Sequence, residues 1–95
     1  MTAYLIYDVE IHDPEPYGEF MKQVKPLVER MGGKYLVRGG AHEVLEGDWT
    51  PHRIVLFEFP DMDSARRLFN SEDYAPLKAL RQSCSTGHAV VVEGV

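Results

Sequence analysis

Four residues of this sequence have side chains that could handle an acidic small molecule. They are two carboxylates, an arginine and a histidine: Asp8, Arg38, Glu58 and His88. An arginine can hold a carboxylate through two parallel hydrogen bonds, and a histidine or a carboxylate can move a proton. Where such side chains meet, they could bind an anionic substrate and transfer a proton. The alternative is structural, an ion pair between Arg38 and Glu58 that neutralises two charges near an interface.

Three further residues could belong to the same pocket. Arg81 falls on an apolar helical stripe with Tyr74, where it could anchor an acidic ligand or tie the helix to the sheet. Trp49 lies in a predicted turn and could cover a pocket or anchor an interface between subunits. The candidate pocket therefore comprises Asp8, Arg38, Trp49, Glu58, Tyr74, Arg81 and His88. No catalytic residue can be assigned among them.

Motifs typical of metal, cofactor or nucleotide sites are absent from the sequence. The four histidines lack the spacing of zinc ligands, and Cys84 is the only cysteine. There is also no glycine-rich phosphate loop and no G-x-S-x-G nucleophile motif. We therefore expect no metal, no bound cofactor and no hydrolase triad.

Length and composition indicate one small domain over residues 1–95. The net charge is −5 and no basic run is present, so nucleic acid is not an expected partner. No apolar run approaches the roughly 20 residues of a membrane helix. The first residues carry Asp8 and Glu10 and lack the basic start of a signal peptide. Together with the single thiol, these features predict a cytoplasmic protein.

Hydrophobic periodicity predicts the elements that must position the candidate residues. Residues 2–11 alternate, with apolar side chains on both faces, which is typical of a central strand. Asp13 and Pro14 then open a helix whose apolar residues recur with a period of 3.6 until Gly32 and Gly33 end it. Two shorter helices are expected between residues 61 and 84, and a last strand over residues 88–93.

The stretch from Arg38 to Pro60 is predicted to form one β-hairpin. The second strand would begin at Lys34, contain a bulge or a close backbone approach at Gly39-Gly40 and continue through residues 41–46; residues 47–51 would be the turn and residues 52–60 the third strand. Counting back through this turn pairs Gly40 with Glu58 and makes Arg38 a diagonal neighbour of Glu58 on the same face. The order strand, helix, strand, strand, helix pair, strand then predicts an α+β, ferredoxin-like sandwich with a four-stranded antiparallel-type sheet.

In this predicted sheet the first and third strands are adjacent and parallel, with the other two strands at the edges. That arrangement would bring Asp8, Arg38, Glu58 and His88 together at one end of the sheet. The helices would cover one face only. The other face would expose a set of apolar side chains, namely Ile6, Val44, Ile54, Leu56, Val90 and Val92. Such a patch is unusual on a soluble monomer, so we expect a homodimer that packs sheet against sheet.

Several motifs resemble the domain-of-unknown-function 1330 family across nearly the whole chain. The most specific are the run from Gly32 to Gly40 and the step Glu58-Phe59-Pro60, supported by Asp13-Pro14-Glu15 before the first helix. The resemblance implies the dimeric α/β-barrel superfamily, in which two ferredoxin-like subunits pack with their sheets facing. That superfamily includes cofactor-free monooxygenases, muconolactone-type isomerases, haem-degrading enzymes and stress-response barrels, whereas the family itself has no settled activity.

Two functions remain open on this basis. The first is a homodimeric protein that binds a small oxygenated or acidic metabolite, either as a binding protein or as a cofactor-independent enzyme of monooxygenase or isomerase type. The second is a non-catalytic binding or stress-related barrel, in which the charged cluster is structural.

Overall fold

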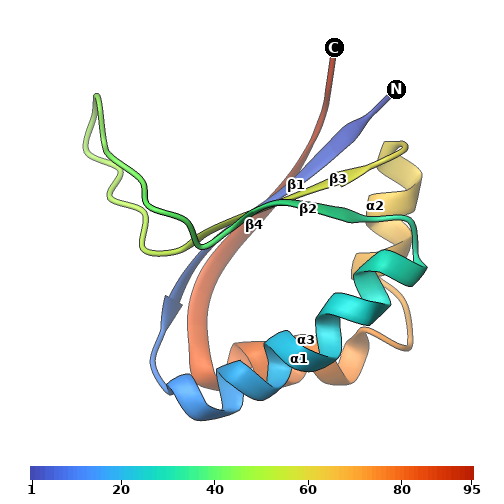
Figure 1. Ribbon diagram of the computed structural model, residues 1–95, viewed down its shortest axis with the longest axis horizontal. Coiled ribbons are helices and arrows are strands. Elements are labelled where there is room, and N and C mark those ends of the chain that lie inside the picture. The colour runs from blue at the N-terminus through green and yellow to red at the C-terminus, as the bar shows by residue number, and fades with distance from the viewer.

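The computed structural model describes all 95 residues, with one four-stranded sheet and three helices packed on one of its faces (Figure 1). The elements in chain order are β1 (Ala3–Ile11), α1 (Pro14–Arg30), β2 (Lys34–Arg38), β3 (Ile54–Phe59), α2 (Met62–Phe69), α3 (Ala75–Cys84) and β4 (Ser85–Glu93). The strands lie in the order β2-β3-β1-β4, and every neighbouring pair is antiparallel. The predicted α+β, ferredoxin-like fold is confirmed, with β4 starting directly after α3.

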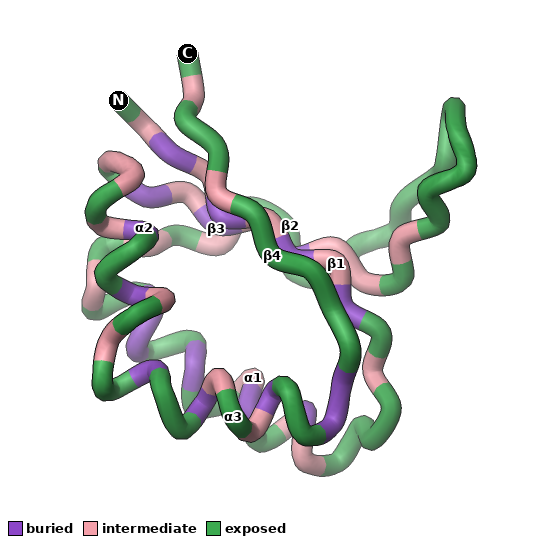
Figure 2. Tube along the Cα trace, turned by 180° about the vertical axis from the view of Figure 1, so that it is seen from behind, coloured by how far each residue is buried: buried purple, intermediate pink, exposed green.

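The local sequence patterns explain the elements around the core. In β1, Leu5, Tyr7 and Val9 are buried while the residues between them face the other side of the sheet. The helix α1 starts after Asp13 with Pro14 in its first turn, and the chain leaves it where Gly32 adopts a φ of +92°. Buried residues follow the facing sides of the sheet and the helices (Figure 2). None of the three helices combines the length and the apolar character that a membrane span requires.

The predicted hairpin is wrong in its length and its register. β2 ends at Arg38 and β3 begins at Ile54, so residues 39–53 form a long connection that projects beyond the sheet (Figure 1). Lys34 lies opposite Glu58, and Arg38 lies opposite Val55. The physical reason is at Gly39, whose φ of +71° turns the chain out of the extended conformation immediately after β2.

The predicted parallel pairing of the first and third strands is also wrong. The crossover through α1 makes β1 and β2 run in the same direction, but β3 returns from β2 and lies next to β1, so it is antiparallel to both. In this pairing Asp8 lies opposite Ile54, and Tyr4 lies opposite Glu58. Asp8 and Glu58 therefore occupy opposite ends of the sheet.

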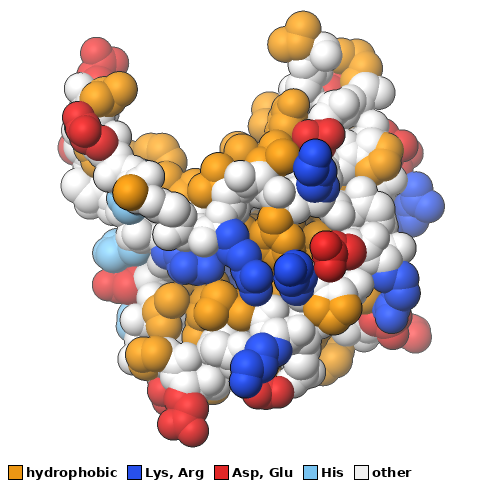
Figure 3. Space-filling model, in the orientation of Figure 1, with side chains coloured by type: hydrophobic (Ala, Val, Ile, Leu, Met, Phe, Trp, Pro, Cys, Tyr) orange, Lys and Arg blue, Asp and Glu red, His pale blue; other side chains and the backbone are white.

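The face of the sheet that the helices leave uncovered, called the open face below, is largely apolar. Ile6 lies between Leu56 on β3 and Val90 on β4, and Val90 is 56% exposed. Val44, expected on this face, lies instead in the connection. Figure 3 shows apolar side chains along the hollow between the projecting connection and the chain ends. A surface of this kind is typical of an interaction site.

Gly33 packs against the core where a side chain has no room. A Cβ atom at this position would lie 2.6 Å from Val28 Cγ1 and 2.7 Å from Phe59 Cζ, both in buried residues. Because such overpacking typically costs about 1–3 kcal/mol, Gly33→Ala is expected to lower the free energy of unfolding by that amount in urea denaturation. The control is Gly18→Ala in α1, where nothing lies within 4 Å, and a gain of about 0.5–1 kcal/mol is expected. A neutral Gly33→Ala would contradict the packing described here.

Candidate functional site

A cavity of about 30 Å³, enough for one or two water molecules, lies between the sheet and the helices α1 and α3. Thirteen of its sixteen lining residues are hydrophobic, and the other three are arginines. The hydrophobic residues are Leu5, Tyr7, Val9, Tyr17, Phe20, Met21, Val24, Val28, Tyr35, Val55, Phe57, Leu68 and Tyr74. The arginines are Arg38, Arg53 and Arg81. We call this the inner pocket.

The three arginines span the inner pocket from its interior to the surface. Arg81 is only 6% exposed, Arg53 is half-buried and Arg38 is exposed. Each guanidinium lies over an aromatic ring: Arg81 is 5.0 Å from the centre of the Tyr7 ring and Arg38 is 4.9 Å from that of Tyr35. The Nε atoms of Arg53 and Arg81 are buried and have no hydrogen-bond partner.

No carboxylate neutralises the arginines of the inner pocket. The ion pairs of the structure join Arg30 to Asp73, Arg66 to Asp63 and His52 to Glu10, all at exposed side chains. The hydrogen bonds of the pocket guanidiniums go to Met21, from Arg38 Nη2 to its carbonyl oxygen (3.2 Å) and from Arg53 Nη2 to its sulfur (3.4 Å). Basic side chains gather around apolar surface on this face of the molecule (Figure 3). The pocket therefore carries uncompensated positive charge.

The tyrosines of the inner pocket are neutral hydrogen-bonding groups. The hydroxyl groups of Tyr7 and Tyr74 are 3.1 Å apart and hydrogen-bonded. Burial, followed by the proximity of Tyr74, raises the pKa of Tyr7 far above its ordinary value, and burial raises the pKa of Tyr35 to about 12. Burial also raises the pKa of Tyr17, although the guanidinium of Arg53 opposes this. At neutral pH Tyr7, Tyr17 and Tyr35 stay protonated, so their hydroxyl groups can donate hydrogen bonds to a ligand oxygen.

The structure brings together three of the seven candidate residues in the inner pocket. Arg38, Tyr74 and Arg81 line it. Tyr74 immediately precedes α3 and Arg81 lies near its end, both on the predicted apolar stripe. Arg38 reaches the helix-covered face because the strand irregularity between Tyr35 and Val37 shifts its register.

The other four candidate residues lie elsewhere. Asp8, Trp49 and His88 line a second groove, of about 660 Å³, between the connection and the open face. Glu58 lines neither site and has Tyr4 and Lys34 as its cross-strand neighbours. Asp8 and His88 meet as predicted, directly opposite each other on β1 and β4, but Arg38 and Glu58 do not join them, and no ion pair joins Arg38 to Glu58. The antiparallel pairing of β1 and β3 separates Glu58 from Asp8, and the register of β2 against β3 separates Glu58 from Arg38.

Sequence reasoning missed Arg53 and the pocket tyrosines 7, 17 and 35. A signal for Arg53 existed, because alternate residues back from Phe59 are buried and reach Val55. Arg53 lies two residues before Val55, so the same alternation places this charged side chain at an inward position.

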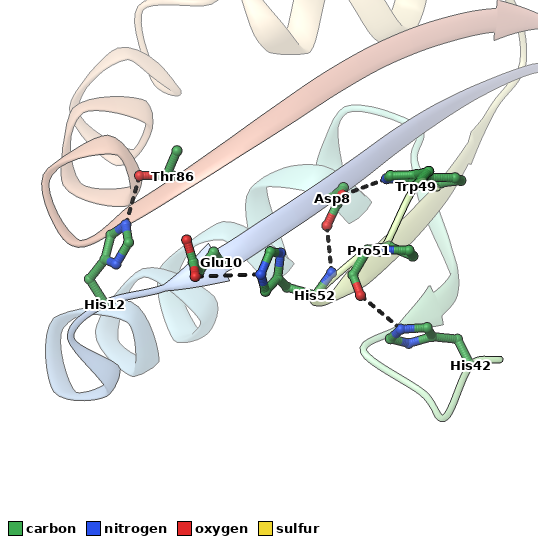
Figure 4. Close-up of polar contacts among 8 residues, drawn as sticks. All are labelled: Asp8, Glu10, His12, His42, Trp49, Pro51, His52 and Thr86. Atoms are coloured by element: carbon green, nitrogen blue, oxygen red, sulfur yellow. Dashed lines mark hydrogen bonds and ion pairs between the residues drawn. The ribbon is translucent and has the colours of Figure 1, made fainter. Parts of the chain in front are cut away.

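The second groove contains a set of hydrogen bonds that hold the connection against β1 (Figure 4). One carboxylate oxygen of Asp8 accepts from the indole Nε1 of Trp49 and the other accepts from the backbone N–H of His52, both at 2.9 Å. Burial alone would raise the pKa of Asp8, but these hydrogen bonds together with the nearby imidazoles of His52 and His88 lower the pKa below its ordinary value. His52 also lies 3.4 Å from Glu10. No group of three or more His, Cys, Asp or Glu side chains is placed to hold a metal ion.

Comparison with solved structures supports the fold. A protein of unknown function from Rhodopseudomonas palustris superposes with a TM-score of 0.79 at 17% identity, over 99% of this chain and 82% of that one. The cofactor-independent oxygenase SnoaB from Streptomyces nogalater gives a TM-score of 0.72 at 14% identity, over 99% and 93% of the two chains. An antibiotic biosynthesis monooxygenase gives 0.57 at 17% identity, over 100% and 99%. At these identities the likeness shows the fold alone.

Comparison by sequence gives no match among curated proteins. A family model described as "Domain of unknown function (DUF1330)" matches residues 2–95.

Proposed function

This chain belongs to the family of the domain of unknown function DUF1330, and we propose that it is a homodimeric protein whose inner pocket binds a small, largely apolar metabolite with an acidic group. Arg81, Arg53 and Arg38 would hold the anionic oxygens, and the Tyr7–Tyr74 pair would donate a hydrogen bond. Because the cavity of about 30 Å³ is too small for such a molecule, the sheet and the helices would have to separate locally before their hydrophobic side chains could enclose the rest of it.

The observation that carries this proposal is the unpaired charge of Arg81. A buried guanidinium without a carboxylate or a full set of acceptors is unfavourable, because its solvation is lost and not replaced. Its Nε has no partner, and no acidic residue lines the pocket around it. A ligand anion would supply the missing acceptors with the planar, two-point geometry that arginine prefers.

Catalysis in this pocket would depend on the ionised ligand. No carboxylate and no imidazole lines the pocket, so no side chain there is suited to shuttle a proton as an isomerase requires. The three positive charges would instead favour the enolate or phenolate form of a weakly acidic ligand. Electron-rich anions of this kind are the form that a cofactor-independent oxygenase needs. Among the enzymatic functions, we therefore favour the monooxygenase-like one over the isomerase-like one.

The homodimer would form through the open face, as in two ferredoxin-like subunits that pack sheet against sheet. The row of Leu56, Ile6 and Val90 supports this arrangement, because it would leave water on association. The only thiol, Cys84, is buried and suits a reducing compartment, so the cytoplasm remains the predicted location.

Titration with benzoate and its neutral analogue benzamide tests the proposal directly. By isothermal calorimetry we expect benzoate to bind and benzamide to bind at least about tenfold more weakly, since a charge-assisted hydrogen bond contributes roughly 1.5–3 kcal/mol. Oxygen uptake with any acidic ligand that binds would then separate an oxygenase from a non-catalytic binding protein. Equal affinities for the two compounds, or binding of neither, would contradict the anion-binding function.

A further inference from the structure

We propose that Asp8, on the open face of the sheet, is a positioning residue that holds Arg53 in the inner pocket on the opposite face. The inference rests on the proposed function only where ligand binding is measured, because the position of Arg53 can be observed without a ligand. It links the attachment of the connection at the open face to the charge that Arg53, the last residue of the connection, brings to the inner pocket on the other face.

Asp8 attaches the connection to β1. Asp8 accepts one hydrogen bond from the indole of Trp49 and one from the backbone N–H of His52 (Figure 4). A carboxylate offers one oxygen to each of the two donors. The attachment therefore fixes the chain immediately before Arg53.

The side chains of His52 and Arg53 lie on opposite faces of the sheet. His52 lies on the open face, where its ring is 3.4 Å from Glu10. The chain here runs beside β1, since the carbonyl oxygen of Arg53 accepts a 2.9 Å hydrogen bond from the Val9 N–H. The chain bends at His52, and Arg53 points inward as the buried Val55 does two residues later, so fixing His52 also fixes where Arg53 enters the inner pocket.

The Arg53 side chain reaches the inner pocket by passing directly beside Gly39. A Cβ atom on Gly39 would overlap the Arg53 guanidinium, and the φ of Gly39 is +71°. Beyond Gly39, the guanidinium lies 5.9 Å from the centre of the Tyr17 ring and donates to the Met21 sulfur. Asp8 thus fixes the backbone from which the Arg53 side chain extends, and the absence of a side chain at Gly39 leaves the space that the guanidinium occupies.

Asp8→Asn separates positioning from simple electrostatics. Removing a negative charge near the pocket would strengthen anion binding if only charge mattered. The amide, however, replaces one acceptor oxygen with a donor group that faces a donor, so one of the two hydrogen bonds is lost. Positioning therefore predicts the opposite sign, a weaker affinity for an anion.

The ligand-free test uses the two buried arginine Nε–H groups, whose exchange with solvent is measurable by ¹⁵N NMR. Asp8→Asn is expected to speed exchange at Arg53 at least about tenfold and to leave Arg81, held on α3, unchanged. Gly39→Ala should act in the same way. Asp13→Asn, which removes the same charge from a side chain without a capping hydrogen bond, is the matched control. Unchanged exchange at Arg53, or equal acceleration at both arginines, would overturn the proposal.

The ligand arm uses benzoate titration of Asp8→Asn, Arg53→Met and the double variant. If Asp8 acts through Arg53, Asp8→Asn lowers the affinity several-fold and has no further effect in the Arg53→Met background. Additive losses, or tighter binding by Asp8→Asn, would overturn the positioning role. A wild-type protein that binds no benzoate would refute the proposed function, while the exchange measurement would still decide the role of Asp8.

Discussion

Arg81→Met is expected to abolish benzoate binding without lowering the free energy of unfolding. The guanidinium is 6% exposed and its Nε lacks a partner. Losing two charge-assisted hydrogen bonds of roughly 1.5–3 kcal/mol each would weaken the affinity by at least about a hundredfold. Methionine fills a similar volume without a charge to desolvate, so we expect stability to be equal or about 1 kcal/mol higher, after the lost contact with the Tyr7 ring is counted.

This result distinguishes a ligand-binding arginine from one that ties the helix to the sheet. Urea denaturation measures the stability, and calorimetry measures the affinity. Arg66→Met is the matched control, because the Arg66 side chain is 54% exposed and lies away from the inner pocket. It should leave both quantities nearly unchanged. A loss of more than about 2 kcal/mol in Arg81→Met would instead indicate a structural role for the guanidinium.

Val90→Lys is expected to convert the proposed dimer into a folded monomer. Val90 is 56% exposed in the isolated chain, so lysine is tolerated there, but it would be buried if two open faces met. The symmetry of such a dimer buries two lysines at once. At several kcal/mol for each buried charge, the dissociation constant should rise on the order of 10⁴-fold or more.

Light scattering at micromolar concentration would measure this change against the chain mass of 10.8 kDa. Ala79→Lys is the control, because it adds the same charge to an exposed position of the helix α3. It should remain dimeric. A wild-type chain that is monomeric at this concentration would refute the homodimer, and a dimeric Val90→Lys would place the interface elsewhere.

The fold could be predicted from the sequence because its elements are marked by local patterns. The alternation of β1 and the stripe of α1 identify their buried faces, and the Asp13-Pro14 start and the Gly32 end follow from backbone chemistry. Pairing between strands is not local. One glycine with a positive φ, Gly39, moved the hairpin register, and the direction of β3 followed from the return of the chain rather than from any side chain.

The site was predictable only in part for the same reason. Arg81 was identified because a charge interrupts an apolar stripe within one helix. Arg53 was missed because its face depends on where β3 begins, and Glu58 was misplaced because its neighbours depend on the direction of β1. Residues that approach through two elements are determined by tertiary structure, which single-sequence periodicity does not encode.

Only the single layer of the β-sheet separates the open face from the inner pocket. Within β1, Asp8 faces the second groove, while Tyr7 and Val9 face the cavity. In a dimer joined at the open faces, the two cavities would lie on the outer sides of a double sheet, with the exposed Arg38 at each entrance rather than at the interface. A small molecule could then enter and leave while the subunits stay together, so its exchange rate would not depend on protein concentration.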